Sequence, residues 1–180
     1  ERLLSSPASQ RKPLCLENTK TQSFLLLFSF FLESPATGRK GLRVLSRTIL
    51  ATDAQTAGKL FAGILETVFA NIDSAPEESC DVAVSLARKK HGQENWAPLC
   101  DRIIKNMETK NSLRTKNTLR LLAALFIGIG TDFAIMLPEL MSPLARLSGE
   151  KDETIQETLQ SAVAEIERAL GQSIEKYIVT

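Results

Sequence analysis

Hydrophobic residues recur at every third or fourth position along most of the chain, which is the period of an amphipathic α-helix. Residues 60–72 show this pattern best, because seven hydrophobic side chains keep the spacing before the turn residues 73–76. No segment shows the convincing alternation of hydrophobic and polar residues that is typical of a β-strand. The sequence therefore predicts an all-α protein.

The helix boundaries are predicted from capping residues, glycines and prolines. Asp152 is placed to cap the last helix and Gly171 to end it. Pro143 lacks a backbone N–H donor, so it should kink or split the helix that contains it. The cluster 34–38 should separate the first two helices. We expect helices over residues 18–33, 39–50, 60–72, 77–90, 96–107, 112–129, 135–147 and 152–170.

The predicted helices form pairs, and the pairs repeat along the chain. Leu99 aligns with Leu137 in the first helices of two successive units, 38 positions on. Two positions in the second helices, Leu113 and Leu121, align with hydrophobic residues 42 positions on. A period near 40 residues is typical of HEAT and armadillo units, which stack to form a solenoid. We therefore expect the second helices to pack side by side and nearly parallel; the alternative is an irregular globular helix bundle.

The composition excludes several classes of protein. The 180 residues fit one domain, with 43% hydrophobic and 24% charged residues and a net charge of +1. Three cysteines, widely spaced and without a CxxC pair, argue against a disulfide framework or a cysteine zinc site and fit a reducing compartment. The hydrophobic run 24–32 imitates a signal peptide, but it is too short to span a membrane and favours a buried helix.

No motif in the sequence predicts catalysis. The single histidine, His91, stands beside basic residues near a helix end, and neither Cys80 nor Cys100 has an identifiable base. Gly128 and Gly130 lack the preceding strand and third glycine of a dinucleotide loop, so we expect them to end the helix 112–129. The acidic residues 150–153 lack the spacing of an EF-hand. We expect no enzyme activity, metal site, cofactor or small-molecule substrate.

The positive charges gather in particular segments. Residues 1–50 contain eight Lys and Arg against three Glu, whereas residues 150–168 contain six acids against two basic residues. Arg39, Arg43 and Arg47 follow one helical stripe, and Lys40 lies next to it. Such a stripe can bind RNA phosphates or an acidic partner, and the alternative is an ordinary solvated helix face. Aromatic residues are few, so stacking on RNA bases is poorly supported.

Several of these segments resemble one family of helical-repeat proteins. The motif Trp96-Ala97-Pro98-Leu99, the helix 113–127 and the segment 136–147, with its two prolines, occur in the family's order. The family then ends with Leu-Gly, a short amphipathic turn and a terminal aromatic, which here are Leu170-Gly171, Ile174 and Tyr177. The chain, over about residues 20–180, is similar to the C-terminal HEAT units of the largest subunit of the UtpA complex.

The resemblance implies a non-catalytic scaffold of the small-subunit processome, a nucleolar ribonucleoprotein that supports ribosomal RNA processing and ribosome biogenesis. It implies the C-terminal end of a longer array, with an irregular segment 1–17, helical hairpins over 18–92, and two HEAT-like units with a capping helix over 93–180. The expected partners are other UtpA-complex and processome proteins, pre-ribosomal RNA and the U-three small nucleolar RNA, without a membrane. The alternative function is a self-contained α-helical adaptor or a small helical enzyme.

Overall fold

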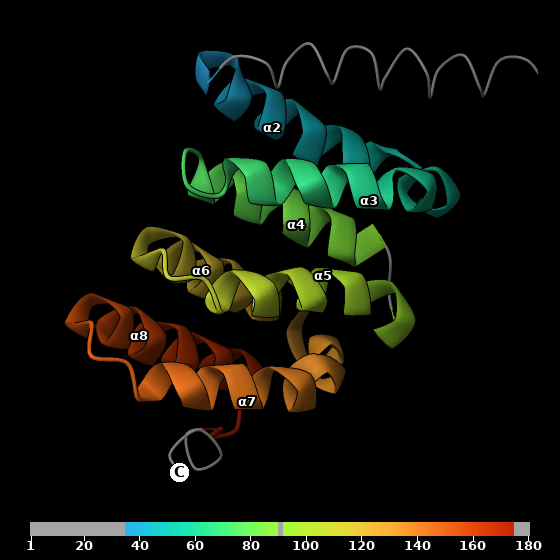
Figure 1. Cartoon of the computed structure of the whole chain (residues 1–180). Coiled ribbons are helices and arrows are strands. Elements are labelled where there is room, and N and C mark those ends of the chain that lie inside the picture. Colours follow the sequence, from blue (N-terminus) through green and yellow to red (C-terminus); the bar gives the residue numbers. More distant parts are fainter. Residues whose placement is uncertain (1–34, 90–91, 175–180) are drawn as a thin grey trace, which may run out of the picture.

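The computed structural model describes residues 35–89 and 92–174, and this part of the chain is all-helical, without strands (Figure 1). The predicted helix 18–33 and the run 24–32 lie outside the described residues. Within them, the all-α prediction is confirmed. The elements are α2 (Pro35–Ala51), α3 (Ala54–Asn71), α4 (Pro76–Lys89), α5 (Gln93–Met107), α6 (Ser112–Ile129), the 3-10 helix η1 (Gly130–Met136), α7 (Leu137–Ser148) and α8 (Glu153–Leu170).

The helices form two rows. In one row α2 packs on α4, α4 on α6, and α6 on α8. The other row contains α3, α5 and α7, and each of these helices packs against the helix that follows it in the first row (Figure 1). The hydroxyl of Ser112, at the start of α6, donates a 2.7 Å hydrogen bond to Asp152, the N-cap of α8. Because their N-termini adjoin, α6 and α8 run side by side in the same direction, as the sequence predicts.

One continuous hydrophobic core lies between the two rows. Three aromatic rings stand at its centre: Phe133 of η1 makes edge-to-face contacts with Trp96 and Phe126, at centroid distances of 5.2 and 5.1 Å. The indole N–H of buried Trp96 donates to the carbonyl of Ala87 at 3.0 Å, which ties α5 to α4. The aromatic contacts join α5 and α6 to the short element η1, which the sequence pattern does not predict.

Capping residues fix several helix ends. The side chains of Asp53, Asn111 and Asp152 accept hydrogen bonds from the first turns of α3, α6 and α8. Gly130 and Gly171 follow α6 and α8 with φ of 79° and 69°, a conformation that glycine adopts without strain. The predicted roles of Asp152, Gly130 and Gly171 are therefore confirmed.

Several details of the sequence prediction are wrong. Pro143 does not split its helix, because α7 runs from Leu137 to Ser148 and packs through Leu140, Leu144 and Leu147. Residues 35–38 of the cluster do not precede α2 but begin it, with Pro35 at the first position, where a missing N–H costs nothing.

Two leucines that fit the helical spacing of hydrophobic residues lie outside the core. Leu113 is 51% exposed, because the buried face of α6 follows Thr115, Leu119 and Leu122, and Leu113 is out of that register. Leu50 is 46% exposed, one position past the buried Ile49. A difference of one or two positions turns a side chain by 100° or 200° around a helix.

The segment Ser112–Ser148 meets the length and composition that a membrane-crossing helix requires, with a mean hydropathy of 1.9 over 18 residues. Length and composition do not distinguish such a helix from a core helix. Here the segment comprises α6, η1 and α7, and α6 lies between α4 and α8 with nine buried residues. Its hydropathy therefore matches its position in the centre of the stack.

Candidate functional site

The basic stripe predicted from the sequence lies on α2. Leu42, Leu45 and Ile49 form the buried face of this helix. The four stripe residues Arg39, Lys40, Arg43 and Arg47 are all exposed. The structure therefore places the stripe on the surface, but the four side chains are not equally free to bind an external partner.

Two of the four side chains bind α4 or the turn just before it. The Arg39 guanidinium donates to the carbonyl of Ser74 at 3.1 Å. Arg43 donates to one carboxylate oxygen of Glu78, from Nη2 at 2.8 Å and from Nε at 3.2 Å. Both partners stand 35 positions further along the chain. Arg39 and Arg43 therefore hold the first two helices of the row together, a role that the sequence analysis did not assign to them.

The other two side chains, Lys40 and Arg47, make no hydrogen bond or ion pair with another described residue. They flank Arg43 at three and four positions along the helix and are exposed to solvent. Of the predicted stripe, Lys40 and Arg47 are thus the two cations that can bind an external phosphate or carboxylate without breaking a contact inside the described chain.

Polar contacts between helices of the same row follow a regular sequence separation. In the row of α2, α4, α6 and α8, they join residues 35 to 40 positions apart, as in Arg88 donating to the Gly128 carbonyl at 2.9 Å. In the row of α3, α5 and α7, the Arg102–Glu66 pair spans 36 positions and the Arg146–Glu108 pair, at 3.0 Å, spans 38. The contacts in both rows therefore repeat with the same period as the helix pairs.

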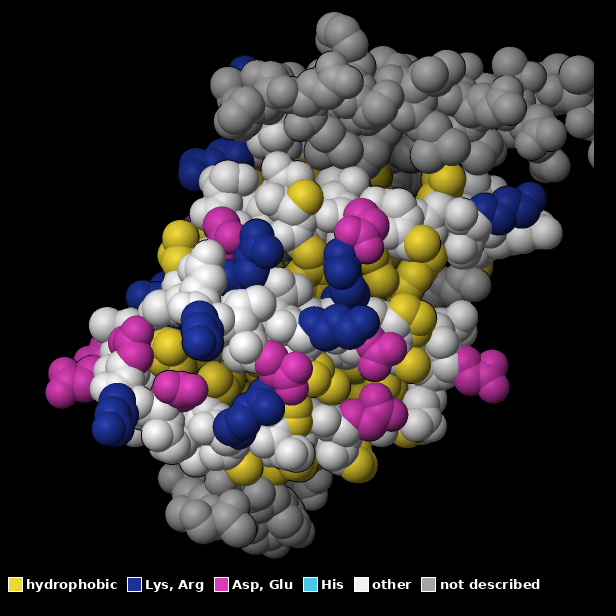
Figure 2. Space-filling view, viewed as in Figure 1, with side chains coloured by type: hydrophobic (Ala, Val, Ile, Leu, Met, Phe, Trp, Pro, Cys, Tyr) yellow, Lys and Arg dark blue, Asp and Glu magenta, His cyan; other side chains and the backbone are white. Residues whose placement is uncertain are grey.

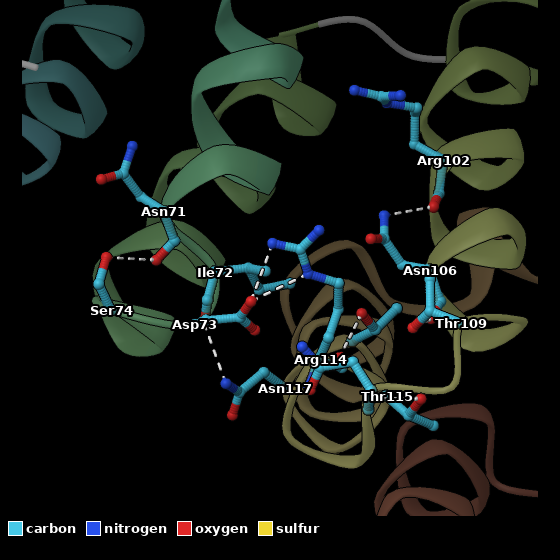
Figure 3. Close-up of polar contacts among 12 residues, drawn as sticks. Asn71, Ile72, Asp73, Ser74, Arg102, Asn106, Thr109, Arg114, Thr115 and Asn117 are labelled. Atoms are coloured by element: carbon cyan, nitrogen blue, oxygen red, sulfur yellow. Dashed lines mark hydrogen bonds and ion pairs between the residues drawn. The ribbon is translucent and has the colours of Figure 1, made fainter.

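A polar cluster at the turn between α3 and α4 joins that turn to α6 (Figure 3). Arg114 donates to Asp73 at 2.9 Å, and Asn117 donates to the backbone carbonyl of Ile72 at 3.1 Å. Asn117 is buried. The guanidinium and the amide of α6 thus bind the carboxylate and the backbone carbonyl of the turn. This cluster stabilises the packing of helix pairs rather than presenting groups to a ligand.

A shallow open groove of about 430 Å³ runs between α6 and α8. Its floor contains the small buried side chains of Ala123 and Ala162. Its sides contain charged and hydroxyl groups: Arg120 of α6, and Glu157, Thr158, Ser161 and Glu165 of α8. The acidic character of residues 150–168 is visible in the sequence, but the groove is not, because it forms only where α6 and α8 lie side by side.

The two described cysteines are poor nucleophiles in this environment. Burial, together with the nearby Asp81 carboxylate, raises the pKa of the Cys80 thiol to about 12. Burial likewise raises the pKa of the Cys100 thiol to about 12, together with the Glu139 carboxylate. Because the thiolate is the reactive form, both side chains are suited to packing.

The acidic segment 150–153 has a structural role at Asp152. Hydrogen bonds from the side chains of Thr154 and Ser112 lower the pKa of this carboxyl to about 2, so it is charged at neutral pH and caps α8. Among the described residues, no group of three or more His, Cys, Asp or Glu side chains is arranged to hold a metal ion. His91 lies outside the described residues.

Charges of both signs are mixed on the face of the molecule where α3, α5 and α7 lie toward the viewer. Figure 2 shows Lys and Arg next to Asp and Glu across this face. The Arg102–Glu66 and Arg146–Glu108 pairs belong to this row of helices. A mixed surface does not favour a polyanion such as RNA, so the exposed side of α2 remains the better candidate.

No protein-family model matches the chain, and no curated protein or solved structure matches it either. The resemblance to the UtpA subunit therefore stays a prediction from sequence motifs. The structure establishes an all-α arrangement in two rows. Any function must be inferred from that arrangement, from its exposed charges and from the groove between α6 and α8.

Proposed function

We propose that the chain is part of a HEAT-like α-solenoid that acts as a non-catalytic scaffold. The observation that carries this proposal is the narrow range of separations between contacting residues of helices in the same row: 35 positions for Arg43–Glu78, 40 for Ser112–Asp152 and 38 for Arg146–Glu108. In an irregular bundle these separations would vary with each connection. In a repeat array each unit contacts mainly its neighbours, so the separations stay close to the repeat length.

The repeating unit in this proposal is a helical hairpin. The pairs are α3–α4, α5–α6 and α7–α8, and α2 is the second helix of a preceding pair. Each second helix packs on the next second helix, and each first helix packs on its own partner. Such units bury their hydrophobic faces only by stacking, which explains the continuous core between the two rows.

The scaffold that we propose is the C-terminal region of the largest UtpA subunit, within the small-subunit processome of the nucleolus. The sequence motifs support this assignment, and their residues have positions that suit a repeat protein. Trp96 is buried near the start of α5, and Pro138 stands in the first turn of α7, where proline is tolerated. As a processome scaffold the chain would bind other UtpA and processome proteins, and pre-ribosomal or U-three RNA.

RNA contact in this proposal is through charge alone. Lys40 and Arg47 are exposed on α2 and have no partner among the described residues. Lysine and arginine bind phosphate oxygens without reading the base sequence. We therefore propose that these two side chains bind the RNA backbone, whereas Arg39 and Arg43 keep α2 on α4.

The test compares two variants of the full chain that lose the same amount of positive charge. Lys40→Gln/Arg47→Gln changes the stripe, and Lys59→Gln/Lys105→Gln removes two exposed lysines from α3 and α5. Binding to a structured RNA is measured as a function of salt, and incorporation of the tagged chain into nucleolar pre-ribosomal particles is measured in cells. We expect the stripe variant to weaken binding to all RNA sequences and to flatten the salt dependence by about one unit of slope per lost contact.

Two outcomes would contradict the proposal. If both variants lose RNA affinity equally, the binding is a general charge effect and the stripe is only a solvated face. If the unmodified chain neither binds RNA nor enters the particle, the processome assignment is wrong. Specific binding of the chain to a protein outside that particle would then favour the self-contained helical adaptor.

A further inference from the structure

The groove between α6 and α8 has unpaired charges along one side. Glu157 and Glu165 line it from α8, and neither makes an ion pair or hydrogen bond with another described residue. Glu157 is exposed and Glu165 is half-buried. An acidic side chain with no partner inside the described chain can pair with a cation from outside at no structural cost.

The two carboxylates are regularly placed. Glu157, Ser161 and Glu165 are four residues apart, so they form one row along α8 with its ends about 12 Å apart. In an extended peptide, alternate side chains point to the same face, and two residues four positions apart are separated by about 13 Å. A basic residue at each end of a five-residue extended segment therefore matches the two glutamates.

The opposite side of the groove has the reverse charge. Arg120 projects from α6. The hydrogen bonds between α6 and the start of α8, Lys116–Thr154 and Ser112–Asp152, span 38 and 40 positions, which places Arg120 level with residues 158–160. Within the described chain its hydrogen bond is a long one, at 3.4 Å, to Asn117. Arg120 therefore stands level with the part of α8 between the two glutamates, where it would repel a third basic residue and attract an acidic one.

The floor of the groove allows close approach of a peptide backbone. Ala123 and Ala162 are buried, and their side chains end at the first carbon. The hydroxyls of Thr158 and Ser161 lie at the rim. Thr158 donates to the Thr154 carbonyl at 2.8 Å and can still accept from a backbone amide, whereas Ser161 can donate or accept. A narrow bottom of small residues with polar edges suits an extended chain better than a second helix, which is about 10 Å wide.

We propose that this groove binds an extended segment of a protein partner with the pattern basic-x-acidic-x-basic. The two basic side chains pair with Glu157 and Glu165, and the central acidic side chain pairs with Arg120. This interaction does not depend on the RNA contact of α2, because the groove residues belong to α6 and α8 and carry the opposite dominant charge. The chain would then bind a polyanion at α2 and a basic peptide between α6 and α8, at the two ends of the row of second helices.

Two labelled peptides of identical composition test the pattern. One contains Lys-Ala-Asp-Ala-Lys and the other Lys-Lys-Asp-Ala-Ala, each between Gly-Ser flanks. Binding to the full chain is measured by fluorescence anisotropy at low salt. We expect saturable binding of the first peptide and at least fivefold weaker binding of the second. Added salt should weaken the first interaction, since exposed ion pairs are screened.

Two variants locate the binding site. Glu157→Gln/Glu165→Gln should weaken the first peptide at least fivefold, whereas Glu94→Gln/Glu139→Gln, which removes two exposed carboxylates from α5 and α7, should leave it unchanged. Circular dichroism confirms that each variant is folded. Absence of saturable binding, equal affinity for the two peptides, or equal losses in the two variants would each overturn the proposal. So would RNA or a second copy of the chain occupying the groove in place of the peptide.

Discussion

The guanidinium of Arg43 on α2 and the carboxylate of Glu78 on α4 form an ion pair at 2.8 Å, although the two side chains differ greatly in their exposure to solvent. The Arg43 side chain is 66% exposed, and that of Glu78 is 6% exposed. Glu78 also stands in the first turn of α4, where the helix dipole favours a negative charge. Loss of Arg43 would therefore leave a nearly buried carboxylate without its cation, which costs more than loss of an exposed pair.

Arg43→Gln should lower the free energy of unfolding by about 1.5–3 kcal/mol, the range for a hydrogen bond to a charged group. Arg47→Gln removes the same charge from the same helix and should stay within about 0.5 kcal/mol of the parent. Urea unfolding followed by circular dichroism measures both. Adding Glu78→Gln to each variant completes a double-mutant cycle, and a coupling near zero would show that the pair does not stabilise the fold.

Two buried residues of the second helices test the core. Leu122 and Ile166 are both 0% exposed, one on α6 and one on α8. Leu122→Ala and Ile166→Ala should each destabilise the protein by about 2–5 kcal/mol, since each leaves a cavity. Ile127→Ala is the control, because Ile127 is also on α6 but is 59% exposed. A similar thermal shift for all three would mean that the buried face is wrongly assigned.

The cysteines should be unreactive while the protein is folded. At pH 8 a thiol with a pKa of about 12 has roughly a thousandfold less thiolate than one at its ordinary value of 9.0. In a Cys15→Ser variant, Cys80 and Cys100 should therefore react with a thiol reagent only as fast as the protein unfolds. Fast reaction of either thiol in the absence of urea would contradict the assignment of both side chains to packing.

The same thiols give a pH dependence of stability. Their pKa values are raised by folding from 9.0 to about 12, so the folded state keeps protons that the unfolded state has lost. The stabilisation is fully present below pH 9 and is lost as the pH rises toward 12. Urea midpoints at pH 8, 9.5 and 10.5 measure the decline. A Cys80→Ala/Cys100→Ala variant should decline less steeply over this range, and an identical slope would exclude the thiols as the cause.

The sequence pattern predicts most of the fold because the information it uses is local. The hydrophobic spacing locates α3, and Asp152 and Gly171 define the ends of α8. The alignment of Leu121 with Val163 predicts which helices lie side by side, since both residues are buried on neighbouring second helices. Local pattern fails where packing decides instead, as in η1, in the intact helix around Pro143 and at the exposed Leu113.

The candidate site is less predictable, because it depends on which charges find partners across helices. The sequence shows four basic residues on α2 as equivalent. In the structure, Arg39 and Arg43 bind Ser74 and Glu78, and Lys40 and Arg47 do not bind another described residue. A signal for this difference exists in the sequence, since Glu78 follows Arg43 by one repeat length. It becomes interpretable only when the period of the repeat is known.

Gly128 is needed for the close packing of α6 on α4 and not for the end of α6. The sequence predicts that it helps to end α6, but Gly130 provides the positive φ, and Gly128 is helical. A methyl group at Gly128 would lie 2.4 Å from Cγ1 and 3.3 Å from Cγ2 of Val84 on α4. Valine has few alternative rotamers in a helix, so its side chain cannot move aside easily. The absence of a side chain at Gly128 is therefore what lets the end of α6 approach α4.

Gly128→Ala should destabilise the protein by about 1–3 kcal/mol, the usual cost of overpacking. Gly63→Ala is the matched control, since Gly63 lies in α3 and an added methyl group would meet nothing within 4 Å. That control should stabilise the protein by about 0.5–1 kcal/mol, because alanine favours a helix interior over glycine. In a Val84→Ala background the clash is removed, so Gly128→Ala should cost little or nothing there. If Gly128→Ala stabilises the parent as Gly63→Ala does, the close contact of α4 and α6 is not a constraint on this position.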